Sequence, residues 1–160
     1  MTGNQALLKR IAKRFRQEKT IVDAIFNGVP GIIYLIDDQG RAVRWNRRLP
    51  ESTGYTDEEI RQMNCLEYFR GADAELIAQR VVQTLTDGSS DAEVEFYRKD
   101  GSHFSIYLTS VRVIIDGKAH IAGVGIDISE RRRAVEALAR SEAELRRHKK
   151  ELELTVEQRT

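Results

Sequence analysis

The sequence of 160 residues contains one cysteine, two prolines and no long apolar run. The single cysteine, Cys65, excludes an internal disulfide and a cysteine-based zinc site. No stretch approaches the ~18 apolar residues that a membrane-spanning helix needs, and the N-terminus lacks the apolar core of a signal peptide. These absences predict a cytoplasmic module with no membrane insertion and no metal site.

Charged residues make up 32% of the chain, and their excess lies at its two ends. The formal net charge is +1 overall, +4 for residues 1–27 and +2 for residues 129–160, which leaves about −5 for residues 28–128. The N-terminal basic residues are interleaved with apolar ones, and the balanced total argues against a dedicated polyanion binder. We therefore predict no nucleic-acid partner.

No catalytic centre is predicted. Phosphate-binding and dinucleotide-binding glycine patterns are absent, and no nucleophile, base and orienting group fall together on recognisable elements. His148 lacks the sequence context of a phosphorylated kinase histidine. We therefore expect that this chain of 160 residues is not an enzyme by itself.

The N-terminal segment, residues 1–27, is expected to form an amphipathic helix that ends at Gly28-Val29-Pro30-Gly31. Its apolar residues recur at helical steps. They are Leu8, Ile11, Phe15, Val22 and Ile25. Such a helix lies either on the sheet of its own domain or against a second subunit, and we expect Leu8, Ile11 and Phe15 in a dimer seam.

Residues 28–128 are expected to form an α+β core. The pattern predicts two strands, short helices and then three strands joined by tight turns. The expected strands are Ile32–Ile36, Arg41–Asn46, Ala92–Arg98, His103–Ile115 and Lys118–Ile128, and the longer helix is Asp73–Leu85. Thr56 and Glu59 have the spacing of a capping box, which predicts a short helix from that point. The helices should gather on one side of an antiparallel sheet.

The last strand runs directly into residues 129–160, a segment without glycine or proline. The apolar period changes there from about two to about 3.5 residues, as expected for a strand that feeds a helix. Leu138, Leu145 and Leu152 lie seven apart, on one stripe of that helix. We therefore expect a coiled-coil linker helix.

Two imperfect seams compete on this helix. One adds Ala134, Ser141, His148 and Thr155 to the three leucines, and the other adds Val135 and Val156 but includes Glu142 and Lys149. Two competing registers would permit rotation or slipping between states. A simple parallel dimer stalk is the alternative.

Three separated motifs carry a resemblance to a known family. They are GYTDEEI at residues 54–60, YRKDG at 97–101 and GVGIDISER at 123–131. With the order of elements, they closely resemble a PAS domain with its PAC half over about residues 20–133. The resemblance implies the PAS fold, a five-stranded antiparallel sheet in the order 2-1-5-4-3 with short helices on one face and a pocket between them. The tail resembles the linker to bacterial histidine kinase or diguanylate cyclase domains.

The family's aspartate and hydroxyl positions map onto Asp127 and Ser129. Both side chains could accept from free N–H groups in the first turn of the linker helix and so fix its exit angle. Helix capping and signal coupling are compatible. We expect the residues of this junction to couple the core to the linker; they are Asp127, Ser129, Glu130 and Arg131.

The pocket is expected to be mainly apolar. By the two-residue period of a strand, one face carries Phe104, Ile106, Leu108 and Ser110, and another carries Ile121, Gly123 and Gly125. The two glycines leave space for a small organic ligand, or that space is filled by Tyr34, Tyr68 or Phe69 from across. A filled core is the better default.

A flavin is disfavoured by the residues at the corresponding positions. Asn64-Cys65 resembles the photoactive motif of flavin-binding LOV domains, but Leu66 replaces the arginine that follows it there. The polar residues that hold the flavin would fall at Phe96, Ile106 and Gly125. We expect Cys65 to be an ordinary small buried residue.

Haem is disfavoured as well. Haem-binding relatives commonly take a histidine from the helix before the three-strand meander, and Asp73–Leu85 contains none. His103 and His120 have no second ligand at metal spacing. No cofactor is therefore predicted.

The sequence thus predicts a PAS sensory, signal-relay and dimerisation domain of a bacterial signal-transduction protein. The flanking helices should form a homodimer, and the linker should lead to a covalently attached output domain. A sensor histidine kinase of a two-component system is the first expectation for that output, and a diguanylate cyclase is the next. The contrasting interpretation is a ligand-free structural dimerisation domain, with a flavin or haem sensor as a weaker one.

Overall fold

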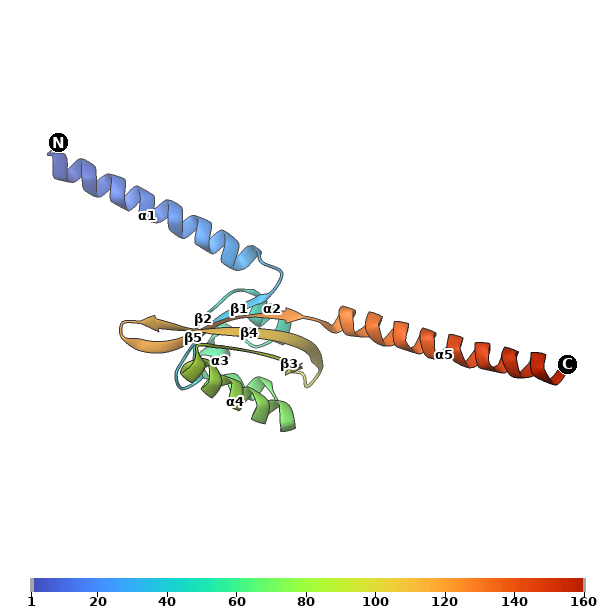
Figure 1. Ribbon diagram of the computed structural model, residues 1–160. Helices are drawn as coiled ribbons and strands as arrows, with labels where there is room; N and C mark the ends of the chain where they lie inside the picture. The colour runs from blue at the N-terminus through green and yellow to red at the C-terminus, as the bar shows by residue number, and fades with distance from the viewer. Residues whose placement is uncertain (1, 160) are drawn as a thin grey trace.

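The computed structural model describes residues 2–159, which form a single five-stranded sheet with helices around it (Figure 1). In chain order the elements are α1 (Gly3–Gly28), β1 (Ile32–Asp37), β2 (Ala42–Trp45), α2 (Arg48–Thr53), α3 (Asp57–Gln62), the 3-10 helix η1 (Cys65–Tyr68), α4 (Gly71–Asp87), β3 (Ser89–Tyr97), β4 (His103–Ile115), β5 (Lys118–Asp127) and α5 (Ser129–Arg159).

The sheet is antiparallel at every pairing, with the strand order β2-β1-β5-β4-β3. The expected α+β class, strand number and strand order are confirmed. β5 is the central strand, paired with β1 on one side and β4 on the other. Because α5 begins two residues after β5 ends, the C-terminal helix leaves from the middle of the sheet.

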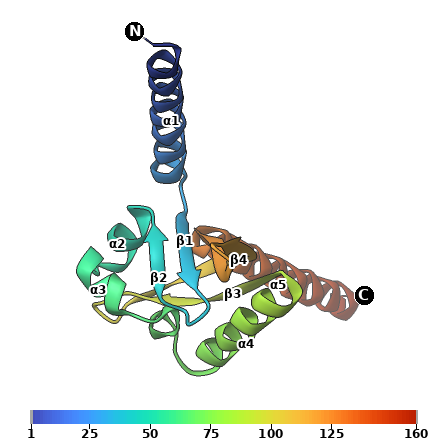
Figure 2. The same ribbon diagram turned by 90° about the vertical axis from the view of Figure 1, so that its left-hand side faces the viewer.

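The core lies on one face of the sheet, between the strands and the helices α2, α3 and α4 (Figure 2). Side chains of a strand alternate between faces, and Phe104, Ile106 and Leu108 all point into this core, as expected. Apolar side chains of the opposite face stay exposed, including Val111 and Ile126. The sheet therefore has one covered face and one open face.

The predicted capping box at the start of α3 is confirmed. Thr56 Oγ1 accepts from the backbone N–H of Glu59 at 3.3 Å, and Glu59 Oε2 accepts from the N–H of Thr56 at 2.9 Å. Glu59 Oε1 also accepts from Lys99 Nζ at 2.6 Å. The lysine hydrogen bond is the main reason why the pKa of Glu59 lies below its ordinary value. Two of the three motifs therefore meet at this point.

Several elements differ from the sequence prediction in their existence or their bounds. The helix α2 was not predicted; its Pro50 lies in the first turn, where proline is tolerated. α4 begins at Gly71 instead of Asp73. Ser89 and Ser90 belong to β3 and not to a turn, because Gly88 alone, at φ +99°, ends the preceding helix.

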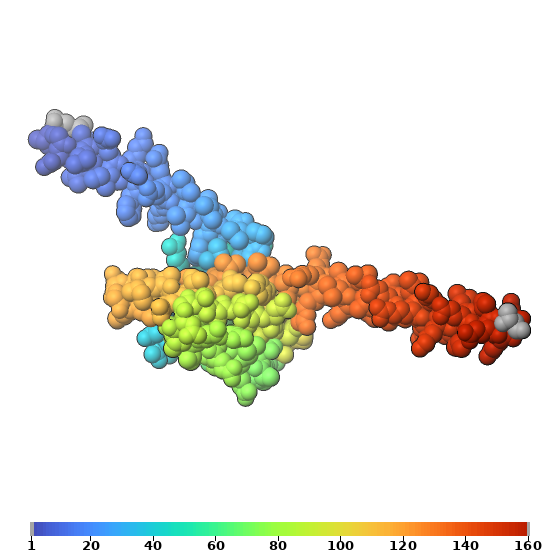
Figure 3. All heavy atoms as spheres, viewed as in Figure 1, coloured from blue at the N-terminus to red at the C-terminus, as the bar shows by residue number. Residues whose placement is uncertain are grey.

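The two terminal helices stand clear of the core (Figure 3). Neither α1 nor α5 has a buried residue within the part of the chain that the structure describes. α1 contacts its own domain only near its last turn and does not cover the open face of the sheet (Figure 2). Among residues 2–159, no helix is long and apolar enough to cross a membrane.

Candidate functional site

A cavity of about 80 Å³ lies between the sheet and the helices. Five of the residues expected to line a pocket do line it; they are Tyr34, Tyr68, Phe69, Ile106 and Leu108. The other three, Phe104, Gly123 and Gly125, are not part of its wall. Phe104 instead packs against Phe96 and lies under the guanidinium of Arg98. The cavity is well below the ~300–1,000 Å³ of typical drug-sized ligand sites.

The space beside the two glycines is occupied by neighbouring side chains. A Cβ placed on Gly123 would collide with the phenol of Tyr34. A Cβ on Gly125 would lie 2.7 Å from Ile106 Cδ1 and 3.0 Å from Leu108 Cδ2. Of the two interpretations of these glycines, the filled core is the one the structure shows. The absence of a side chain at each glycine lets a large neighbouring side chain pass across the sheet face.

Most polar side chains on the cavity wall are paired with one another. Tyr34 Oη lies 2.8 Å from Ser110 Oγ. Thr84 Oγ1 lies 2.6 Å from Ser90 Oγ, and both oxygens lie within hydrogen-bond distance of the carbonyl of Arg80, so one hydroxyl donates to the carbonyl and the other to its neighbouring hydroxyl. Burial raises the pKa of Tyr34 to about 12. The hydroxyl therefore stays protonated at neutral pH.

Cys65 is a wall residue of the same cavity. Burial raises the pKa of its thiol to about 11. The thiol is thus protonated at neutral pH, whereas a reactive cysteine needs its thiolate form. Cys65 is only partly buried, so the expected buried cysteine is found in part.

The junction between β5 and α5 is held by both expected side chains, although one acts differently. Asp127 Oδ1 accepts from the backbone N–H of Ser129 at 2.8 Å, as a capping carboxylate should. Ser129 was expected to cap the helix, and this prediction is wrong. Its hydroxyl accepts instead from the N–H of Ser105 on β4 at 3.1 Å. The N–H of Ile128 donates to the carbonyl of Ser105 at 2.9 Å. Ser129 therefore fastens the first turn of α5 to β4.

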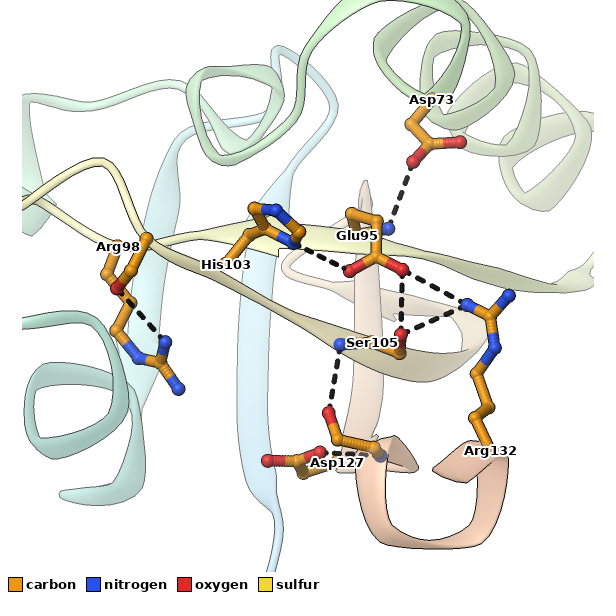
Figure 4. A network of polar contacts seen from close by, with 9 residues as sticks. Asp73, Glu95, Arg98, His103, Ser105, Asp127 and Arg132 are labelled. Atoms are coloured by element: carbon orange, nitrogen blue, oxygen red, sulfur yellow. Dashed lines mark hydrogen bonds and ion pairs between the residues drawn. The ribbon is translucent and has the colours of Figure 1, made fainter. Parts of the chain in front are cut away.

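A polar network centred on Glu95 joins β3, β4 and α5 (Figure 4). Glu95 Oε1 accepts from Ser105 Oγ at 2.7 Å and from Arg132 Nη1 at 3.0 Å. Arg132 Nη1 also donates to Ser105 Oγ at 3.0 Å. The second carboxylate oxygen, Oε2, lies 3.0 Å from His103 Nδ1. We refer to Glu95, His103, Ser105 and Arg132 as the Glu95 network.

The Glu95 network is charged and partly open to solvent. The side chain of Glu95 is 30% exposed and that of Arg132 47%. The hydrogen bond from Ser105 is the main cause of a lowered pKa of Glu95, and His103 and Arg132 lower it further. The carboxylate is therefore ionised at neutral pH and can hold the arginine of α5.

The Glu95 network adjoins the cavity through its neighbours on β3 and α4. Phe96 follows Glu95 in β3, points to the opposite face and lines the cavity. The backbone N–H of Glu95 donates to Asp73 Oδ2 at the start of α4, at 3.0 Å. A shift of Phe96 or of α4 would therefore displace Glu95.

The junction of α1 with the core is built differently, around one buried amide. Asn46 is 1% exposed, and its Nδ2 donates to the carbonyls of Phe26 at 2.8 Å and Gly31 at 2.9 Å. Its Oδ1 accepts from the N–H of Ile33 at 3.0 Å. Arg44 adds an ion pair to Asp23 at 3.1 Å on the surface. The end of α1 is thus tied to both β1 and β2.

The remaining predicted site residues are exposed. Glu130 and Arg131 lie on the surface of α5 and make no hydrogen bond or ion pair within the described residues. The expected dimer-seam residues are Leu8, Ile11, Phe15, Val135, Leu138, Leu145 and Leu152, and their exposure runs from 53% to 74%. Among residues 2–159, nothing covers these apolar side chains.

The sequence prediction missed Glu95, Ser105, Arg132 and Asn46. The signal for Glu95 and Ser105 was their place on the outward-facing positions of their strands. Arg132 follows directly after the motif that ends at residue 131. Pairing across 37 residues of sequence, as between Glu95 and Arg132, leaves no local pattern.

Comparisons with known proteins agree with this architecture. A family model described as PAS domain matches residues 30–130. The PAS domain of an HTR-like protein from Haloarcula marismortui is 25% identical, with a TM-score of 0.66, and the match covers 75% of this chain and 99% of that one.

Two further solved structures show the same fold. A domain of a sensor histidine kinase/response regulator from Geobacter sulfurreducens is 19% identical, with a TM-score of 0.59, over 69% of this chain and 94% of that one. The N-terminal domain of a diguanylate cyclase with a PAS/PAC sensor from Marinobacter aquaeolei is 17% identical, with a TM-score of 0.55, over 64% and 98%. Because the family model covers more than half of the chain, the chain belongs to the PAS domain family.

Proposed function

We propose that this PAS domain senses or receives a signal in its core and relays it to an output domain through α5. The observation that carries the proposal is the Glu95 network, which ties two strands of the sensing sheet to the first turn of α5. PAS domains occur in histidine kinases and in diguanylate cyclases. The relay role is shared by both kinds of protein.

The physical route runs from the cavity wall to the helix. Phe96 faces the cavity and Glu95 faces the opposite side of the same strand. Interiors are close-packed, so a displaced wall residue shifts its neighbours instead of being absorbed. Displacement of Glu95 would weaken its contact with Arg132, and the exit angle of α5 would then change.

A homodimer through the flanking helices is part of the proposal. α1 exposes apolar side chains such as Phe15, 74% exposed, and its basic residues give residues 1–27 a net charge of +4. The open face of the sheet offers exposed apolar side chains beside the acidic row Asp91, Glu93 and Glu95 on β3. A basic amphipathic helix fits such a face by shape and charge.

In the proposed dimer, α5 forms a parallel two-stranded coiled coil. Leu138, Leu145 and Leu152 belong to both candidate seams, so the choice between registers depends on Val135 and its neighbours. Switching between the two registers would convert a change at the core into a rotation of the helices. Cysteine cross-linking along 134–156 that gives one fixed pattern in every signalling state would exclude this switch.

For the output we propose a histidine kinase first and a diguanylate cyclase second. The tail of α5, residues 154–160, is similar to the segment that leads into a kinase dimerisation helix. Residues 1–160 by themselves are proposed to have no enzymatic activity. The sequence encoded after Thr160 decides between the two outputs. If it encodes neither a kinase nor a cyclase, the assignment of the output domain is refuted.

The second candidate is a structural dimerisation domain without a ligand. A cavity of only about 80 Å³, with the glycine positions filled, favours it. We propose neither a flavin nor a haem: Phe96 and Ile106 offer no polar partners to a flavin, and a cavity of about 80 Å³ argues against both groups.

The relay is tested by a matched pair of arginine variants in the protein with its own output domain attached. Arg132→Met removes the contact with Glu95, whereas Arg133→Met removes an exposed neighbouring arginine that makes no such contact. The expected result is an output activity altered several-fold by Arg132→Met only. Equal activity in the two variants would contradict the relay.

A further inference from the structure

Two polar atoms on side chains that line the cavity have no hydrogen-bond partner among residues 2–159. They are Tyr68 Oη and Arg80 Nε, and both are shielded from solvent. A buried polar group left unpaired is costly and calls for a partner such as a water or a ligand. The two atoms are therefore the best guide to what the cavity holds.

Tyr68 is fixed in place with its hydroxyl unpaired. The residue is 7% exposed, its ring stacks on Phe96 at a centroid distance of 4.8 Å, and Tyr55 packs edge-on at 5.8 Å. Burial also raises the pKa of this hydroxyl. Tyr68 therefore presents a protonated donor that cannot turn to solvent without breaking the aromatic cluster.

Arg80 brings a positive charge to the same cavity. Its Nη1 donates to Gln83 Oε1 at 2.6 Å, and its Nε has no partner. No ion pair joins it to a carboxylate anywhere in the described chain. An arginine in a protein is always charged, so the unpaired Nε of this half-buried side chain can donate to an anion in the cavity.

The other polar side chains of the wall do not meet this need. Thr84 and Ser90 form one hydrogen-bonded group with the carbonyl of Arg80, Tyr34 bonds to Ser110, and the carboxylate of Asp91 accepts from Tyr107 Oη at 3.0 Å. Both unpaired atoms are donors, so their complement is an acceptor, best an anionic one. The rest of the wall is largely aliphatic; it includes Ile32, Ile36, Leu49, Ile60, Ile77, Leu108 and Ile121.

Size narrows the ligand further. The cavity of about 80 Å³ is roughly half of the ~150 Å³ apolar cavity that accommodates benzene. We propose that it binds a short-chain aliphatic monocarboxylate of about two to four carbons, whose oxygens accept from Tyr68 Oη and Arg80 Nε. This assignment rests on the proposed sensory role and names the class of signal.

The probes are sodium acetate, propionate and butyrate, added to the whole chain at constant ionic strength. Propanol and propylamine serve as matched compounds without the carboxylate. The thermal unfolding midpoint and ligand-observed NMR should show saturable binding of the carboxylates only. Equal responses to propanol, or no saturable response to any carboxylate, would overturn the proposal in favour of bound water.

Two variants check the assigned donors. Tyr68→Phe keeps the ring and removes the unpaired hydroxyl, so it should fold at least as stably and bind about tenfold more weakly or worse. Arg80→Met should lose binding, and Arg133→Met on the surface of α5 should bind normally. Unchanged binding in both Tyr68→Phe and Arg80→Met would refute the site.

Failure of this ligand and failure of the relay give different results. If no carboxylate binds but Arg132→Met still alters the output activity, the proposed function stands and the ligand class is wrong. If a carboxylate binds and Arg132→Met behaves like Arg133→Met, the ligand stands and the relay is wrong.

Discussion

The two helices that leave the core are fastened by opposite kinds of contact. α1 is held by Asn46, a neutral amide that is 1% exposed and makes three hydrogen bonds to backbone groups. Besides the hydrogen bonds of Ile128 and Ser129 to Ser105, α5 is held by the charged side chains of Glu95 and Arg132, which are 30% and 47% exposed. A buried neutral anchor is insensitive to salt and mild acid, whereas a half-exposed ion pair responds to both.

This difference assigns different roles to the two junctions. A helix anchored through backbone carbonyls keeps its position for as long as the strands β1 and β2 exist. A helix held by side chains that reach across from β3 and β4 can be released without unfolding the sheet. α1 is thus suited to a fixed position, which the proposed dimer contacts would need, and α5 is suited to movement.

The largest effect is expected from Asn46→Ala. The substitution leaves the carbonyls of Phe26 and Gly31 and the N–H of Ile33 without their partner. Buried groups left unpaired cost about 1–3 kcal/mol each before relaxation, so a loss of about 2–4 kcal/mol is expected. Denaturant unfolding measures it, with Asn4→Ala on the exposed start of α1 as the control. A loss of stability as small as that of the control would show that Asn46 does not anchor α1.

A smaller effect is expected from the charged junction. Glu95→Gln and Arg132→Met should each lower stability by about 1 kcal/mol or less, because both groups remain partly solvated. A double-mutant cycle should give a coupling energy of about 0.5–1 kcal/mol. Additive single effects would show that the two side chains do not interact in solution.

Acid should loosen α5 before α1. The hydrogen bond from Ser105, with His103 and Arg132, lowers the folded-state pKa of Glu95 below its ordinary value of 4.5. A depressed carboxyl pKa stabilises the fold above the ordinary value, and this contribution is lost as the pH falls through the folded pKa. The groups around Glu95 are His103 on β4, Arg132 on α5 and Asp73 on α4.

Amide exchange between about pH 5 and pH 3 measures this order of events, after correction for the intrinsic pH dependence of exchange. Protection of the first turn of α5 should fall in the parent but change little in Glu95→Gln. A fall of the same size in that variant would assign the acid response to other carboxylates.

Salt should give the smallest difference. Exposed charges are screened over ~10 Å at 0.1 M ionic strength, so added sodium chloride should weaken the Glu95–Arg132 pair by a few tenths of a kcal/mol. The hydrogen bonds of Asn46 carry no net charge and should be unaffected. Amide exchange in the last turn of α1 and in the first turn of α5, measured at several salt concentrations, reports on the two junctions. An equal response to salt would show that the two junctions do not differ in this way.

The fold was accessible from the sequence because its signals are local. The Thr56 capping box depends on residues three positions apart, and the alternation that buries Ile106 depends on its own strand. Ser129 could be located but its role could not be predicted, since its partner Ser105 is set by the pairing of β4 with β5. Whether Gly123 leaves a gap or accommodates Tyr34 could not be decided from the sequence, because side-chain volume across the sheet determines it.

Ile128 and Ser129 join the start of α5 to Ser105 on β4, and we infer that the Glu95 network adds the part of this hold that can be released. Hydrogen exchange of the amides of residues 132–136, measured in the parent, Arg132→Met and Arg133→Met, tests it most directly. We expect amide exchange to be several-fold faster in Arg132→Met alone, with amide exchange in the last turn of α1 unchanged. Equal exchange in the three proteins would contradict it.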